Sequence, residues 1–167
     1  MEMLTACHRR IERQCATLRR LVPHLAEQGA DDEARAAAAG VMRYFDTSGM
    51  QHHEDEERDL FPALLESMAG SDAVCLRELT EGLTDEHRAL HAAWERVRAV
   101  LECVASGGAA ALAAEDVEAL SVLYARHIAR EESELLPMAA RLLGDEELAR
   151  IGRAMRERRG IGQAPEA

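Results

Sequence analysis

Two segments of the chain repeat one pattern of histidines and carboxylates. Residues 52–62 read HHEDEERDLFP and residues 127–137 read HIAREESELLP, and the two align without a gap. Positions four apart on an α-helix differ by about 40° around its axis, so a histidine and a glutamate at that spacing can bind one metal ion. Each segment therefore predicts one pair of metal ligands: His52 with Glu56, and His127 with Glu131.

Three neighbouring residues are weaker candidates. Glu57 and Glu132 lie five residues after the aligned histidines, about 140° around a helix, and are expected to point elsewhere. His53 also has a glutamate four residues later. In an isolated helix, the apolar residues on the same face as His53 would form as good a stripe as those on the same face as His52. The internal match with His127 favours His52 as the ligand and leaves His53 either solvated or in support of a ligand.

Further histidines lie on apolar faces of two other predicted helices. His87 and His91 are four apart and stand among leucines and Trp94 that recur every three or four residues, which places both histidines on the buried stripe. His8 lies three residues before Ile11, also on an apolar face. Side chains near the middle of antiparallel helices meet at similar depth, so five imidazoles and two carboxylates should converge in the core.

This predicted ligand set joins imidazoles and carboxylates without a thiolate. It exceeds the four ligands of a structural zinc site, and the mixture of nitrogen and oxygen favours iron, with manganese or zinc as substitutes. Two metal ions bridged by the two carboxylates fit the set best. The predicted ligands are His8, His52, Glu56, His87, His91, His127 and Glu131.

Composition and periodicity predict that helices carry these residues. Aromatic residues make up 3% of the 167 residues, and Ala, Leu, Glu and Arg dominate, which favours an all-α protein. Four long helices with short connections should form an up-down-up-down antiparallel four-helix bundle with a short C-terminal helix, as one domain over residues 1–160 with a frayed tail at 161–167. The helices are expected at about 3–26, 32–68, 72–105, 111–143 and 145–159, the second interrupted near 46–49 and kinked at Pro62.

The charge balance and the cysteines limit the partners and the compartment. A formal charge of −11, from 20 Lys and Arg against 31 Asp and Glu, argues against nucleic acids and anionic membranes as partners. No apolar run approaches the roughly 20 residues that span a bilayer, and no signal-peptide pattern is visible. The four cysteines show no C-x-x-C spacing and are expected as reduced thiols. We therefore expect a soluble, cytoplasmic monomer or homodimer.

Taken together, HHEDEERDLFP, EHRALHAAW and HIAREESELLP, with His8 upstream, resemble the hemerythrin-like, HHE cation-binding proteins over residues 4–143. The resemblance implies a non-haem di-iron centre with an oxo or hydroxo bridge. On this arrangement the second iron keeps an open position for dioxygen, peroxide or another small oxidant. The implied ligands are His87, His91 and His127 on the first iron, His8 and His52 on the second, and Glu56 and Glu131 as bridges.

The last motif departs from that of the oxygen carriers, which space an aspartate five residues after the histidine. Here Glu131 lies four residues after His127 and Glu132 lies five, and the four-residue spacing is common in the HHE branch. That branch is linked to iron sensing, stress, and peroxide or nitric-oxide chemistry. We therefore expect a di-iron protein that binds or senses dioxygen or iron. An enzyme acting on peroxide or nitric oxide, and a regulatory protein whose helix packing reports metal occupancy, are the alternatives.

Overall fold

The computed structural model describes residues 2–67 and 72–161, and within these ranges the chain is helical with no β-strand. The prediction of an all-α protein is confirmed. The predicted connection before residue 72 and most of the predicted tail at 161–167 lie outside the described residues. The α-helices are α1 (Glu2–Gln28), α2 (Asp32–Tyr44), α3 (Met50–Asp55), α4 (Phe61–Ser67), α5 (Asp72–Ala105), α6 (Ala114–Arg130), α7 (Leu136–Leu142) and α8 (Asp145–Arg158), and the π-helical segments are η1 (Phe45–Gly49), η2 (Glu56–Leu60) and η3 (Glu131–Leu135).

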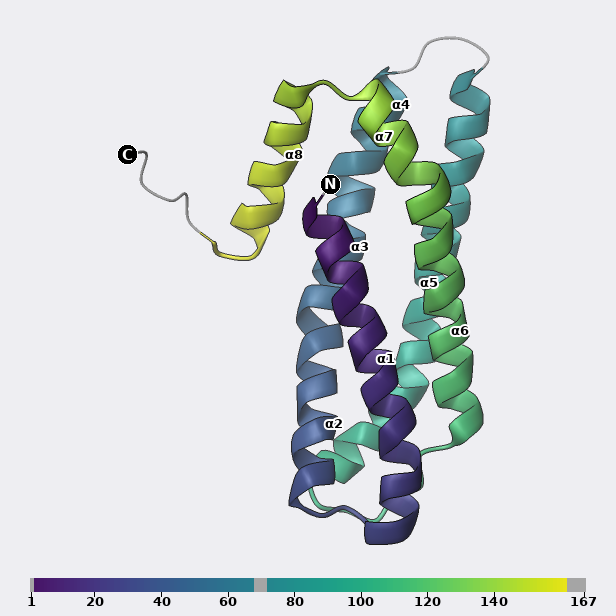
Figure 1. The fold of residues 1–167 in the computed structure, drawn as a ribbon, viewed down its shortest axis with the longest axis vertical. Helices are drawn as coiled ribbons and strands as arrows, with labels where there is room; N and C mark the ends of the chain where they lie inside the picture. Colours follow the sequence, from purple (N-terminus) through teal and green to yellow (C-terminus); the bar gives the residue numbers. More distant parts are fainter. Residues whose placement is uncertain (1, 68–71, 162–167) are drawn as a thin grey trace.

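The long helices lie side by side (Figure 1). α1 contacts α2 and α6, and α5 contacts the same two helices, so these helices surround a common interior. α1 is followed by Gly29, whose φ of 70° suits glycine, and Asp31 then caps α2 by accepting from the Ala34 backbone N–H at 2.8 Å. No helix in the described ranges is long and apolar enough to cross a membrane.

Two of the π-helical segments begin at a predicted ligand. The N–H that closes η2 donates to the Glu56 carbonyl, and the one that closes η3 donates to the Glu131 carbonyl, each five residues back instead of four. Pro62 and Pro137 follow directly. Because proline has no N–H and its ring clashes with the carbonyl four residues earlier, one extra residue in the turn lets the helix continue. The kink expected at Pro62 is therefore preceded by a π-helical turn, and the interruption expected near 46–49 is a third such turn, η1.

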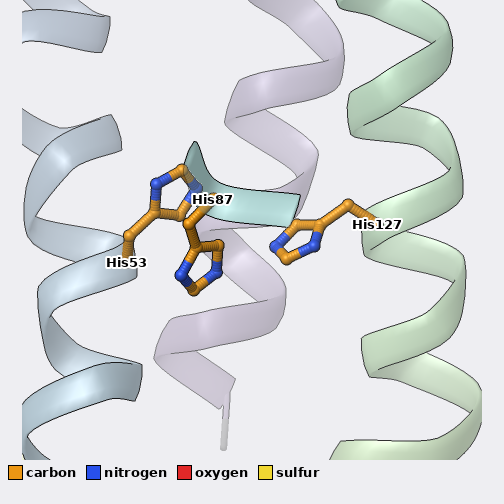
Figure 2. A group of neighbouring side chains, drawn as sticks. All are labelled: His53, His87 and His127. Carbon is orange, nitrogen blue, oxygen red and sulfur yellow. The ribbon is translucent and has the colours of Figure 1, made fainter. Parts of the chain in front are cut away.

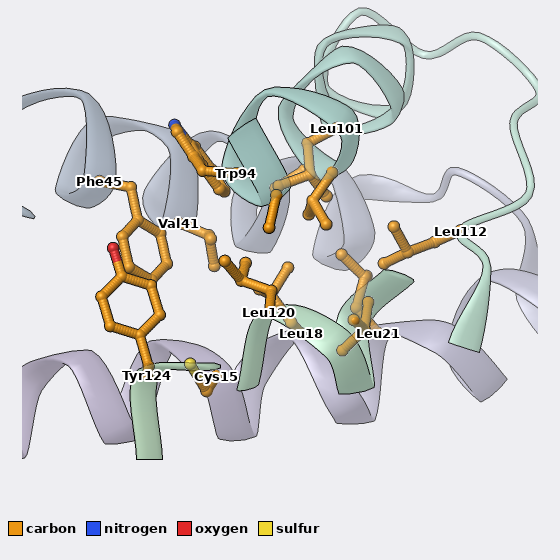
Figure 3. Packing of buried hydrophobic residues seen from close by; sticks show 14 of the residues in the cluster. Cys15, Leu18, Leu21, Val41, Phe45, Trp94, Leu101, Leu112, Leu120 and Tyr124 are labelled. Carbon is orange, nitrogen blue, oxygen red and sulfur yellow. The ribbon is translucent and has the colours of Figure 1, made fainter. Parts of the chain in front are cut away.

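Two apolar clusters fill the interior, with a polar layer between them. The larger cluster includes Leu18, Leu101 and Leu120, and Figure 3 shows its side chains meeting between the helices. The smaller cluster includes Leu4 and Leu64. Along each helix the buried histidines and glutamates come between a residue of one cluster and a residue of the other. The polar layer consists of His8, His52, Glu56, His87, His127 and Glu131.

The C-terminal helix α8 is held to the bundle by apolar and charged contacts. Ile151 and Met155 are buried in the smaller cluster. At the end of α8, Arg158 and Arg159 form ion pairs with Asp55, whose side chain is fully buried. Burial raises the pKa of the Asp55 carboxyl although both arginines lower it, so the ion pairs offset only part of the desolvation cost. α8 is thus tied to the C-terminal end of α3.

Asp55→Ala should destabilise the protein, because it leaves two partly buried arginines without their shared carboxylate. We expect the free energy of unfolding to fall by about 3 kcal/mol, the low end for breaking a buried ion pair, since both arginines keep some access to water. Urea denaturation followed by circular dichroism measures this change. As a control, Asp85→Ala removes an exposed ion pair with Arg88 and should leave the midpoint unchanged. Equal midpoints for the two variants would contradict a role of Asp55 in holding α8.

Candidate metal centre

Six of the seven predicted ligands meet in the polar layer. All six side chains are buried, and both glutamates take part in two overlapping clusters of ligand atoms. Within each cluster the ligand atoms lie within 4.8 Å of one another. The first group is His8, His52, Glu56 and Glu131, and the second group is Glu56, His87, His127 and Glu131.

Glu131 presents one carboxylate oxygen to each group. Its Oε2 lies 2.9 Å from His8 Nε2, and its Oε1 lies 2.9 Å from His127 Nε2. Burial by itself raises the pKa of Glu131, but the close approach of His127 and His8 outweighs burial and holds this pKa well below its usual value. Glu131 is therefore an ionised carboxylate, positioned to bridge two cations.

Glu56 is divided between the two groups in the same way. Its Oε1 lies 3.7 Å from His52 Nε2, and its Oε2 lies 3.3 Å from His87 Nε2. Burial, and then the negative charge of Glu131, raise the pKa of Glu56 well above its usual value. Two carboxylates that share a buried site cannot both ionise without a compensating cation, so Glu56 holds a proton until a cation replaces it.

The inward-facing atoms of these side chains have no hydrogen-bond partner. Each such buried atom costs roughly 1–3 kcal/mol if nothing satisfies it. Apart from Ser121 Oγ, every unpartnered buried side-chain atom in the described ranges belongs to this region. Metal ions with nitrogen and oxygen ligands would satisfy most of these atoms, with one ring nitrogen from each histidine, so the residues present fit such ions. The atoms are His8 Nε2, both ring nitrogens of His52, His53 Nε2, both carboxylate oxygens of Glu56, His87 Nε2, His127 Nε2 and both carboxylate oxygens of Glu131.

Carboxylates outside the centre hold the rear nitrogens of its histidines. Glu132 Oε1 accepts from His8 Nδ1 at 3.0 Å, and Glu57 Oε1 accepts from His87 Nδ1 at 2.6 Å. A proton held on Nδ1 leaves the lone pair of Nε2 directed at the centre. As expected, Glu57 and Glu132 point away from the histidines five residues before them. They orient histidines on other helices instead.

Glu86 holds the rear nitrogen of His127 in the same way. The sequence alone did not indicate Glu86 as a candidate. Its Oε2 accepts from His127 Nδ1 at 2.8 Å, and its Oε1 accepts from Arg130 Nη1 at 2.7 Å. Glu86 directly precedes His87 on α5, but the histidine that it orients lies 41 residues away on α6. No spacing within one helix indicates such a pair, so only the packing of α5 against α6 reveals it.

His53, rather than His91, stands beside the centre. Ligand atoms of His53, His87 and His127 form a third group within 4.8 Å, and Figure 2 shows the three rings meeting. The His53 ring stacks on the His87 ring with 4.0 Å between centroids. The expected burial of His91 is wrong, because His91 is exposed. The buried seam of α5 steps from His87 to Leu90 and onward by three or four residues, and position 91 falls to one side of it.

Sequence comparison agrees with this geometry. The sequence model of the hemerythrin HHE cation-binding domain matches residues 1–139, which contain both groups in full. The chain belongs to the hemerythrin HHE cation-binding family. An uncharacterized protein of Haemophilus influenzae (strain ATCC 51907 / DSM 11121 / KW20 / Rd) is 30% identical over 161 residues, which cover 96% of this chain and 90% of that protein. Membership of the HHE family implies cation binding, and the two groups form a buried site able to hold a metal.

In this HHE domain, His53→Ala should weaken metal binding by about tenfold or more, as loss of a residue that ligates or supports a ligand does. His91→Ala should have little effect, because His91 is exposed and outside all three groups. The metal-to-protein ratio after dialysis against a weak chelator compares the two variants. His24→Ala, which removes a histidine paired with Asp31 away from the centre, is the control. A greater metal loss in His91→Ala would restore the assignment made from the sequence.

Metal binding to the HHE domain should release protons and weaken as the pH falls. Burial by itself lowers the pKa of His8 and of His127, but Glu131 and the outer carboxylates outweigh it and raise both pKa values above 6.5. Glu56 holds a further proton, since its pKa is also raised. His52, whose pKa burial lowers to about 3, holds none. A proton on any ligand atom must leave before a metal ion binds there.

Isothermal titration calorimetry in buffers of different ionisation enthalpy counts these protons. Because the pKa values of His8 and His127 are raised, we expect the metal affinity to begin falling above pH 6.5 and to continue falling toward about pH 5. His24→Ala should leave the number of released protons unchanged, because His24 lies outside the groups. An affinity that is constant over this range would mean that the histidines and Glu56 are not the ligands.

Proposed function

We propose that this protein holds two iron ions, joined by an oxo or hydroxo bridge, and uses them to bind or sense dioxygen or iron. One observation carries the proposal: Glu56 and Glu131 each direct one oxygen to the first group and one to the second group. We further infer that the long helices alternate in direction, as in an up-down-up-down four-helix bundle. The short connection between α1 and α2, which contact one another, supports this topology.

Each proposed ion would receive two imidazoles and two carboxylate oxygens from the chain. Iron in such a set commonly binds more than four ligands, which leaves room for the bridging oxygen and for a small ligand. His53 lies beside the second group, where it either supplies another nitrogen or lines the remaining position. When bound, a pair of iron ions would supply reversible binding and redox chemistry toward dioxygen.

The surroundings of the site support iron and a small partner. Cys7 and Cys15 are buried but belong to none of the three groups, so the donors are the nitrogen and oxygen atoms that suit iron. Apolar clusters on both sides keep bulk water from the polar layer. The charge of −11 supports a small molecule over nucleic acid as the partner.

Fully loaded protein should contain about two iron ions per chain. Mutation can test this stoichiometry, because some ligands belong to one group and others to both. His52→Ala removes a ligand of the first group alone, and His87→Ala one of the second group alone, whereas Glu131→Ala removes a ligand of both. We expect the ratio of iron to protein, from inductively coupled plasma mass spectrometry, to fall toward about one in the single-group variants and toward zero in Glu131→Ala. One firmly bound ion in fully loaded wild-type protein would contradict the two-metal centre.

Optical spectra of the iron-loaded protein then test the function. An absorption band that forms with dioxygen and disappears under argon would support reversible binding. Peroxide that is consumed repeatedly, without a lasting spectral change, would instead assign the protein to the enzymatic alternative. Spectra that respond to neither molecule, in protein with full iron content, would contradict dioxygen binding and leave iron sensing as the function.

A further inference from the structure

A small cavity lies beside His53. Its volume is about 20 Å³, which is room for about one water-sized molecule. None of its lining residues is an aspartate, glutamate, lysine or arginine, and most of them are apolar or aromatic. We call it the His53 cavity; it is lined by Phe45, Gly49, Met50, His53, His91, Trp94 and Tyr124.

The His53 cavity lies between solvent and the second group. On its inner side, the His53 ring stacks on His87 at 4.0 Å and lies 5.8 Å from the His127 ring, measured between centroids. His53 Nε2 is buried and has no hydrogen-bond partner. On its outer side, Met50 is 45% exposed and His91 is also exposed. A molecule that enters past Met50 therefore meets His53 before it meets the ligands of the second group.

The lining of the His53 cavity favours the entry of uncharged molecules over that of ions. An ion that enters an apolar passage loses its hydration at high cost, whereas a neutral diatomic molecule has little hydration to lose. A groove elsewhere on the protein, of about 510 Å³, is lined by Glu57, Glu81, Asp85 and Arg88 among others and has the opposite character. The His53 cavity therefore suits a small, neutral and weakly hydrated molecule.

Gly49 provides space at this cavity. A Cβ atom at position 49 would lie 3.2 Å from Cδ1 of Phe45, closer than nine in ten real Cβ contacts, so the Phe45 ring would have to give by a few tenths of an ångström. Phe45 and Gly49 both line the cavity, so a methyl group at position 49 and the shift of the Phe45 ring would alter the cavity wall. Gly40 is also helical, but a Cβ atom at position 40 would meet nothing within 4 Å. The two glycines thus form a matched pair for substitution.

We propose that the His53 cavity is the port through which a small neutral molecule, such as dioxygen or nitric oxide, reaches the second group. Gly49 keeps the port open and Met50 covers it. The presence of iron ions at the inner end of the port rests on the proposed di-iron function. The port itself depends only on the packing of η1, α3, α5 and α6.

The single tryptophan of the chain reports on the port directly. Trp94 lines the cavity and is 3% exposed, so a quencher reaches its indole only through the protein. We would measure quenching of Trp94 fluorescence by dioxygen in the full chain loaded with zinc, which has no redox chemistry of its own. Gly49→Ala should lower the dioxygen quenching constant by about threefold, because close-packed interiors leave few other voids for passage. Met50→Ala should raise it, and Gly40→Ala should match the wild type.

Acrylamide, which is too large for the cavity, should quench weakly in the wild type and in Gly40→Ala. Two results would overturn the port. One is an unchanged dioxygen quenching constant in both Gly49→Ala and Met50→Ala. The other is acrylamide quenching as efficient as that by dioxygen, which would mean that general opening of the helices admits both molecules. Met50→Ala changes an exposed side chain, so it keeps the test valid if Gly49→Ala does not fold.

A second measurement separates the port from the di-iron centre. In iron-loaded protein, the rate of the spectral change on mixing with nitric oxide should fall in Gly49→Ala, while the iron content and the final spectrum match those of Gly40→Ala. Full iron content with an unchanged rate would contradict the port and leave the proposed function intact. Failure of wild-type protein to bind iron would contradict the proposed function, while the quenching results would still decide whether the port exists.

Discussion

Glu56 and Glu131 are buried side by side in the core, and the groups packed around them compensate for the negative charge of these two carboxylates. Glu56 and Glu131 have no exposed surface, and they face the same few imidazole nitrogens. Two negative charges cannot share such a site unless cations or protons accompany them. Without metal, the protein compensates with a proton on Glu56 and with raised pKa values at His8 and His127. A pair of metal ions would replace these protons and also satisfy the ligand atoms of the first and second groups.

This polar layer constrains the helices as well as the chemistry. It separates the two apolar clusters, so each cluster must hold its end of the bundle with its own leucines. The glutamates that enter the layer each begin a π-helical turn, and a proline follows each turn, at Pro62 and Pro137. The proline of the repeated segment therefore acts on the site through the backbone, because it removes one helical hydrogen bond close to the ligand.

The histidines depend on more than their own helices. Glu57, Glu86 and Glu132 are partly exposed, yet each holds the rear nitrogen of a buried histidine on another helix. A slip of one helix against its neighbour would break these hydrogen bonds and release the rings that they orient. Asp55 adds a comparable link between α3 and the C-terminal helix α8. The orientation of the ligands in this protein therefore depends on how its helices pack.

The helical class and the helical turns that carry ligands were predictable from the sequence. Helical propensity and the three-to-four residue period are local properties, and the repeat of residues 52–62 at 127–137 is visible without any packing. The same local reasoning placed His52 with Glu56, and His127 with Glu131, in positions that the structure brings together.

The packing of the helices, in contrast, sets the place of His53 over His91, the orienting role of Glu86, and the His53 cavity. Periodicity gives the angle of a residue around its own helix, but not the rotation of that helix against its neighbours. Residues four apart differ by only about 40°, so His87 could enter the core while His91 remained at the surface. Contacts between helices, and the spaces that they leave, depend on residues far apart in the chain, and no local pattern encodes them.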